Sequence, residues 1–138
     1  AVGFTRLVGC AYRYFANNGG GHIACITSIA GTKGLGPAPA YSASKAMQNT
    51  YLQALEQLAI SKHHNIHFTD IRPGFVDTPL LAGSSRLPML MTTEKVARSI
   101  LKAVDNRRHV CVIDTRWAVL TFLWRLIPNW IWRRLKLC

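Results

Sequence analysis

Apolar positions along the chain change between helical and strand-like spacing. Residues from about Val2 to Ala16 carry apolar side chains at helical intervals, and so do residues of the stretch Tyr41–Lys62. Ile23–Ser28 and Ile66–Ile71 are short apolar runs rich in residues that favour strands. This pattern predicts two helices and two buried strands in alternation. The apolar positions of the helices are Phe4, Leu7, Val8, Ala11 and Phe15 in the first, and Met47, Leu52, Leu55, Leu58 and Ala59 in the second.

The alternation continues after the second strand. Thr32–Pro39 is a loop rich in Gly and Pro, and Val76–Thr92 is irregular. Thr93–Asp105 is predicted to be a helix, and its first turn holds Glu94, as the helix dipole favours. His109–Ile113 is a third short strand. We therefore expect an α/β fold: a partial, doubly wound parallel sheet of about three strands with flanking helices and right-handed crossovers. The first strand is expected to leave an open apolar edge.

The C-terminal residues have a different composition. From Arg107 onward the chain holds seven Lys or Arg residues against one acidic residue, Asp114. Trp and Phe side chains lie between these charges, and two short helices are predicted on either side of Pro128. Neither helix is long enough to span a bilayer, and Arg125 interrupts the apolar run. We expect residues 1–113 to form one domain and residues 114–138 a basic, Trp-rich helical tail.

The net charge of +11 suggests nucleic acid as a partner, but its distribution argues against that. Trp interleaved with Arg and Lys is typical of a helix that lies in a membrane interface. The alternative is that the tail packs on a partner subunit or on a substrate lid. We expect no nucleic acid partner and a cytoplasmic protein, with peripheral membrane contact through the tail as one of these two open interpretations.

Tyr41 and Lys45 lie four residues apart at the start of a predicted helix, so they share a face. A free Tyr titrates near roughly 10, and lowering that pKa by about 3 units takes about 4 kcal/mol. One cation about 4 Å away supplies roughly that at an effective dielectric near 20. The pair is therefore suited to general acid–base catalysis. By itself it is also consistent with an ordinary amphipathic helix start.

The surrounding motifs favour the catalytic interpretation. Ser28 ends a predicted strand, Tyr41-x-x-x-Lys45 follows, and Pro73-Gly-x-Val-x-Thr78 ends the next strand. In an open parallel sheet, ligands bind at the carboxyl ends of the strands. In this order the motifs resemble the short-chain dehydrogenase/reductase (SDR) family, and the likeness extends to about Ile113. The resemblance implies a Rossmann-like fold and an NAD(P)-dependent oxidoreductase that interconverts a secondary alcohol and a ketone.

The resemblance also implies roles for individual residues. Tyr41 would exchange a proton with the substrate oxygen, Lys45 would lower the pKa of Tyr41 and bind the nicotinamide ribose, and Ser28 would orient the substrate. The helices over 2–16 and 41–62 would form a homo-oligomer interface. The cofactor, NAD or NADP, would be held by Tyr41, Lys45, Pro73, Gly74, Val76 and Thr78.

The segment after Thr78 corresponds to a mobile substrate lid in that family. Its apolar residues Leu80, Leu81, Met89 and Met91 indicate a hydrophobic substrate or, equally, ordinary core packing. The four cysteines and the histidines show no metal-ligand spacing, and no metal is expected. Cys25 and Cys111 fall on predicted strands and are expected to be buried there.

The chain has 138 residues, whereas chains of the resembled family are nearly twice as long. The Gly-rich turn that places a pyrophosphate at a helix N-terminus is absent, because Gly19-Gly20-Gly21 follows a helix and precedes a strand. The residue that selects NAD or NADP is absent too, and the family's catalytic Asn would fall just before Ala1. We expect a fragment of a longer enzyme, inactive alone. The alternative is a catalytically incomplete fragment that acts only as an oligomerisation or membrane-peripheral module.

Overall fold

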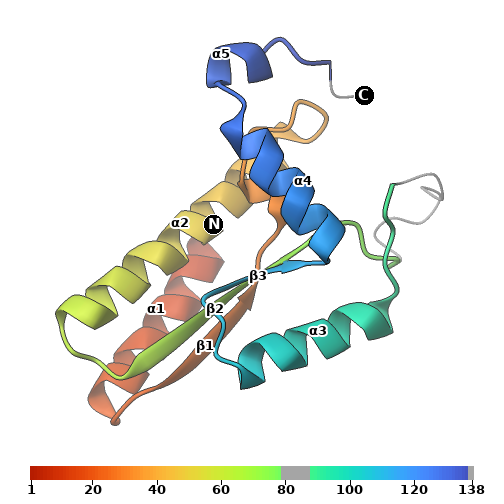
Figure 1. The fold of residues 1–138 in the computed structure, drawn as a ribbon. Helices are drawn as coiled ribbons and strands as arrows, with labels where there is room; N and C mark the ends of the chain where they lie inside the picture. Colours follow the sequence, from red (N-terminus) through yellow and green to blue (C-terminus); the bar gives the residue numbers. More distant parts are fainter. Residues whose placement is uncertain (79–87, 137–138) are drawn as a thin grey trace.

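Three parallel strands form the sheet of this protein, which is described by a computed structural model covering residues 1–78 and 88–136 (Figure 1). The strands are β1 (Gly21–Ile26), β2 (Ile66–Pro73) and β3 (Val110–Ile113), in the order β1-β2-β3. Both pairings are parallel, and Ile26 lies opposite Ile71. The predicted α/β class and parallel sheet are confirmed. Strand β1 ends two residues earlier than predicted, which leaves Ser28 in the loop beyond the strand.

The helices also follow the predicted order. They are α1 (Val2–Asn17), α2 (Pro39–Ser61), α3 (Thr93–Asp105), α4 (Thr115–Leu126) and α5 (Asn129–Trp132), with a short 3-10 helix η1 (Ile29–Gly31). Side-chain caps begin two of the α-helices: the Thr92 hydroxyl accepts from Lys95 N at 3.4 Å, and the Asp114 carboxylate accepts from Arg116 N at 3.1 Å. In the described parts of the chain, no helix is both long enough and apolar enough to cross a bilayer.

One face of the sheet is covered by α1 and α2. Apolar residues of both helices meet alternate residues of β1 and β2, as helical and strand periodicities require. We call this group the first cluster, and it consists of Val8, Tyr12, Ile23, Leu52, Leu55, Ala59, Ile66 and Phe68. Leu7 and Leu58 belong to the same apolar pattern but are exposed.

The opposite face is covered by α3 and by the beginning of the tail. We call its buried residues the second cluster: Ile29, Ile71, Met91, Val96, Ile113 and Trp117. Trp117 comes from α4 and is only 3% exposed, so the tail is anchored in the core. Cys111 packs against this cluster and Cys25 against the first, but both are only half-buried, which corrects the expectation of full burial. Burial, followed by the nearby Asp70 carboxylate, raises the pKa of Cys25 to about 11.

The two crossovers of the sheet differ in hand. The strand order advances in one direction, while α2 and α3 lie on opposite faces (Figure 1). Phe68 in the first cluster and Ile71 in the second point to these opposite faces of the same strand. Connections that advance in one direction on opposite faces must have opposite hands, so the expectation of right-handed crossovers is wrong for one of them. The apolar face of α3 finds its partners on the side that α1 and α2 leave free.

Strand β1 lies at the edge of the sheet and pairs only with β2 in the described ranges. Its first-cluster side is covered by α1 and α2, but Ala24 and Ile26 on the other side are exposed. The expected open apolar edge is therefore present, and an apolar strand edge of this kind tends to pair with another strand.

Candidate active site

Helix α2 begins at Pro39, which suits the first helical turn because its missing N–H would have no helical partner there. Tyr41 therefore falls in the first turn, where its side chain is 47% exposed. Lys45 follows one turn later, and its Nζ lies 5.7 Å from the centre of the Tyr41 ring. The structure thus brings the ammonium and the phenol ring together on one side of α2.

Lys45 also reaches the end of β1. Its Nζ donates to the carbonyl oxygen of Ile26 at 3.5 Å, two residues before Ser28. Burial lowers the pKa of Lys45, and the carboxylate of Asp70 acts in the opposite direction. Among residues 1–78 and 88–136 this long hydrogen bond is the one that the ammonium makes, so N–H donors remain for a ligand hydroxyl.

Ser28 lies two residues after β1 in extended backbone and caps η1, its Oγ accepting from Ala30 N at 3.1 Å. It is buried, and the preceding residue fixes its place: Thr27 N donates to Ile71 O at 2.7 Å across the sheet. A hydroxyl that accepts one bond still has a proton to donate. Ser28 can therefore orient an oxygen at the carboxyl end of β1.

A buried carboxylate, Asp70, supports this strand end and was not foreseen from the sequence. The Thr27 hydroxyl donates to Asp70 Oδ1, while Arg72 donates to Asp70 Oδ2 from Nε at 2.8 Å and from Nη2 at 2.6 Å. Hydrogen-bonded ion pairs of this kind are strong only when every polar group is satisfied. The signal available in the sequence was an Asp-x-Arg pair inside a predicted buried strand.

Two small residues set the distance between η1 and α2. A Cβ on Gly31 would lie 2.6 Å from the carbonyl carbon of Lys45 and 2.5 Å from Asn49 Nδ2. The Ser42 side chain lies within 2.7 Å of Ala30 O and 2.8 Å of Lys33 O, and its Oγ accepts from Leu35 N. Gly31 and Ser42 therefore hold the segment between Ser28 and Tyr41 against the helix, and neither was identified as a site residue from the sequence.

Strand β2 ends at Pro73, and the loop after it runs from Gly74 to Thr78 at the same edge of the sheet. Gly74 lies directly under the indole of Trp117, because a Cβ there would come within 2.3 Å of Trp117 Nε1. Val76 pairs with Met91 in an isolated parallel bridge. Pro73 is buried and Thr78 half-buried. Packing against the tail thus accounts for the glycine, and the cofactor contacts of this loop stay a prediction.

The four residues assigned to a substrate pocket fall in different places. Leu80 and Leu81 lie outside the described residues. Met91 is buried in the second cluster, and the carbonyl of Met89 accepts from Trp117 Nε1 at 3.4 Å. Met91 therefore packs in the core, and a substrate contact by Met89 stays a prediction.

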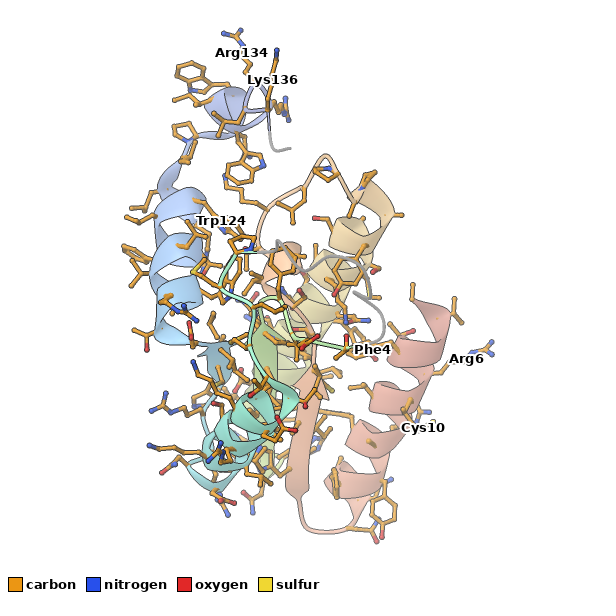
Figure 2. All side chains as sticks on the ribbon, turned by 90° about the vertical axis from the view of Figure 1, so that its right-hand side faces the viewer. Phe4, Arg6, Cys10, Trp124, Arg134 and Lys136 are labelled. Carbon is orange, nitrogen blue, oxygen red and sulfur yellow. The ribbon has the colours of Figure 1, made fainter. Side chains whose placement is uncertain are left out.

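The loop from Thr32 to Gly34, between Ser28 and Tyr41, is fastened by the tail. Trp124 Nε1 donates to Thr32 Oγ1 at 2.8 Å, and Trp132 Nε1 donates to Gly34 O at 2.6 Å. Lys33 Nζ donates to Ile127 O and to the Asn129 side chain, both at 2.8 Å. Figure 2 shows Trp124 reaching from α4 toward the body of the molecule. These contacts join the tail to the candidate site.

Comparisons with known proteins agree with this geometry. The family model of the short chain dehydrogenases matches residues 1–87. An uncharacterized oxidoreductase of Myxococcus xanthus is 31% identical over 110 residues, which are 79% of this chain and 43% of the relative. The short-chain dehydrogenase/reductase family 16C member 6 of Bos taurus is 30% identical over 114 residues, 79% of this chain and 36% of the relative. The chain belongs to the short-chain dehydrogenase family.

Solved structures show the same fold. A short chain dehydrogenase from Burkholderia cenocepacia in complex with NADP superimposes with a TM-score of 0.74 at 18% identity, over 92% of this chain and 53% of that one. A short-chain dehydrogenase from Sphingobium yanoikuyae in complex with NADPH gives 0.73 at 20% identity, over 100% and 55%. The chain is thus a partial Rossmann-like α/β fold that spans about half the length of these structures, and under half of the two relatives above.

Proposed function

We propose that this chain carries the catalytic half of a longer NAD(P)-dependent oxidoreductase that interconverts a secondary alcohol and a ketone. The observation that carries the proposal is the position of Lys45, whose ammonium lies against the Tyr41 ring and is tied to the last carbonyl of β1. A cation held next to a phenol stabilises the negative charge that develops on the oxygen as its proton is transferred, which suits general acid–base catalysis.

In this proposal each residue has one role. Tyr41 Oη gives a proton to a ketone oxygen or takes one from an alcohol. Lys45 supplies the positive charge that makes this exchange easier. Ser28 Oγ donates a hydrogen bond to the same substrate oxygen and fixes its position. The exposure of Tyr41 leaves its hydroxyl accessible to a substrate.

A nicotinamide is needed because protein side chains cannot donate a hydride, and that is the chemistry the bound cofactor would supply. The remaining N–H donors of Lys45 fit a ribose hydroxyl, and Tyr41, Pro73, Gly74, Val76 and Thr78 complete the proposed contacts. The choice between NAD and NADP is left open in this proposal. The names of two similar structures record NADP and NADPH, which supports a nicotinamide cofactor in general.

The proposed enzyme acts on a hydrophobic substrate and forms a homo-oligomer. The apolar residues after Thr78 support the first point. Exposed apolar side chains on the helices that cover the first cluster, namely Val2 on α1 and Ile60 on α2, support the second.

Replacing Tyr41 by Phe in a longer protein that contains this chain tests the proposal. Loss of the hydroxyl should lower turnover by about 10²–10⁴-fold, because a positioned acid–base group contributes about that factor. Cofactor binding, followed by fluorescence of the reduced nicotinamide, should persist. The matched control is Tyr14→Phe, which removes an exposed hydroxyl on α1 and should leave turnover unchanged. Near-normal turnover of Tyr41→Phe would refute the assignment.

A nucleotide titration of the 138-residue chain tests the proposed division of labour. We expect weak or no binding of NADH and NADPH, because the sequence offers no Gly-rich turn between a strand and a helix N-terminus to hold the pyrophosphate. Tight binding would contradict the proposal that another part of a longer protein supplies this cradle.

A further inference from the structure

Helix α4 is apolar on two opposite faces. Trp117 and Thr121 point inward and are buried, and Trp124 is half-buried beside them. The outward residues follow the spacing i, i+3, i+4 and i+7, which puts them on one stripe on the far side of the helix. They are Val119, Phe122, Leu123 and Leu126, all more than half exposed, and Trp130 of α5 is exposed as well.

This stripe is surrounded by positive charge. Residues 115–138 contain five Arg or Lys and no Asp or Glu. The five are exposed: Arg116, Arg125, Arg133, Arg134 and Lys136. Figure 2 shows Arg134 and Lys136 projecting from the end of the molecule that is formed by α5. A hollow of about 720 Å³ between this end and the loop at Gly34 is lined by Lys33, Arg133 and Lys136 among others.

We propose that the tail surface, meaning this apolar stripe with its five cations, binds an anionic lipid bilayer and lies in the interface. Apolar side chains would enter the acyl boundary, while Arg and Lys would contact lipid phosphates. The 12-residue helix is too short to cross the membrane and has the length and composition of an interfacial one. The exposed Trp130 suits the headgroup region, where Trp is enriched.

A second copy of this chain fits the same surface poorly. A two-fold contact places a surface against itself, so its cations would meet the same cations of the second copy. The adjacent carboxylate of Asp114 already pairs with Arg116 and with Lys95, both at 2.9 Å. An anionic bilayer satisfies both the apolar and the charged part of the surface. Because Trp124, Trp132 and Lys33 fasten the tail to the loop before Tyr41, docking would also place that loop near the bilayer.

Vesicle flotation tests the proposal with the 138-residue chain. In a density gradient, protein bound to vesicles rises while aggregated protein sinks. Aggregation through the open edge of β1 would therefore not be mistaken for binding to the vesicles. We expect the chain to float with phosphatidylcholine vesicles that contain phosphatidylserine, and much less with phosphatidylcholine alone. High salt should release it, because the attraction to anionic lipid is screened. Failure to float with acidic vesicles would overturn the proposal.

Matched variants locate the binding surface. Changing Leu123 and Leu126 together to Gln should weaken binding at least about tenfold, because two inserted side chains are lost. The control changes Leu7 and Leu101 to Gln. These two leucines also lie on helices and are exposed, and Leu101 is as exposed as Leu126, both at 63%. The control change should have no effect on binding to the vesicles. Circular dichroism checks that both variants fold.

The charges are tested in the same way. The double change of Arg133 and Arg134 to Gln should weaken binding about thirtyfold, since each basic residue near the surface contributes about 1 kcal/mol. The double change of Arg6 and Arg98 to Gln should not weaken it. Figure 2 shows Arg6 projecting from α1, well away from the tail. Equal losses in test and control variants would overturn the proposal. The proposal would also be overturned if the double change of Leu123 and Leu126 to Gln altered the oligomeric size of the protein but not its flotation. That result would indicate that this surface makes a contact between copies of the chain.

Discussion

The two buried clusters on either side of the sheet are assembled in different ways. The first cluster draws its eight residues from two helices and two strands, at the intervals that each element dictates. The second takes one residue from each of six separate places, including η1, the segment before α3, and the tail. One cluster is therefore encoded mainly in local periodicity, and the other depends on segments distant in sequence meeting correctly.

The candidate site lies between these two clusters. Lys45 belongs to the helix that covers the first cluster, while Ser28 directly precedes Ile29 of the second. The loop of Gly74 is pressed from the tail side by Trp117. Damage to either cluster should therefore reach the site, but by different routes.

The largest effect is expected from Trp117→Ala, compared with Phe68→Ala in the first cluster. Both side chains are at most 3% exposed, so each change should lower the free energy of unfolding by about 3–5 kcal/mol in urea titrations. Only Trp117→Ala should also release the tail, seen as early tryptic cleavage between residues 116 and 136. The exposed Trp130→Ala serves as a control with little change in stability. If trypsin cleaves the tail of Trp117→Ala no faster than the tail of the unaltered chain, the hydrogen bonds between the tail and the loop from Thr32 to Gly34 are enough to hold it.

A smaller effect is expected from Asp70→Asn, which acts where the clusters meet. Arg72 would lose its carboxylate partner, and stability should fall by roughly 2–3 kcal/mol, with exposed Asp105→Asn as control. The carboxylate of Asp70 raises the pKa of Lys45, so its removal should lower that pKa further. The Lys45 ammonium would then lose its proton at lower pH. In a longer active protein, the alkaline decline of turnover should therefore move to lower pH, and a move to higher pH would contradict this electrostatic role.

The smallest effect is expected from Gly31→Ala, which changes the close contact between η1 and α2. The added methyl would meet the backbone of Lys45, and the adjustment should cost about 1–2 kcal/mol. Gly36→Ala is the matched control, because nothing lies within 4 Å of a Cβ there. Thermal unfolding of both variants measures the difference. Equal melting temperatures would mean that η1 can move away from α2 without cost.

Much of the local structure was predictable from the chain. Helix α3 begins and ends at the predicted residues Thr93 and Asp105, because a capping Thr and an amphipathic repeat are both local signals. The predicted tail helices are present on either side of Pro128, and α5 is a single turn that ends at Trp132. The predicted division between residues 113 and 114 separates the region that holds the candidate site residues from the tail. Trp117 of that tail nevertheless packs in the second cluster, which belongs to the core of the first region.

The sequence by itself determined the alternation of strands and helices and the closeness of Tyr41 to Lys45, because both follow from the period of a single element. Only the tertiary structure decided the rest. The Thr27–Asp70 bond joins residues 43 apart, and Trp132 reaches Gly34 across 98 residues. The hands of the two crossovers likewise depend on which face each helix covers. Contacts of this kind depend on how whole elements pack, and no local pattern of polar and apolar residues records them.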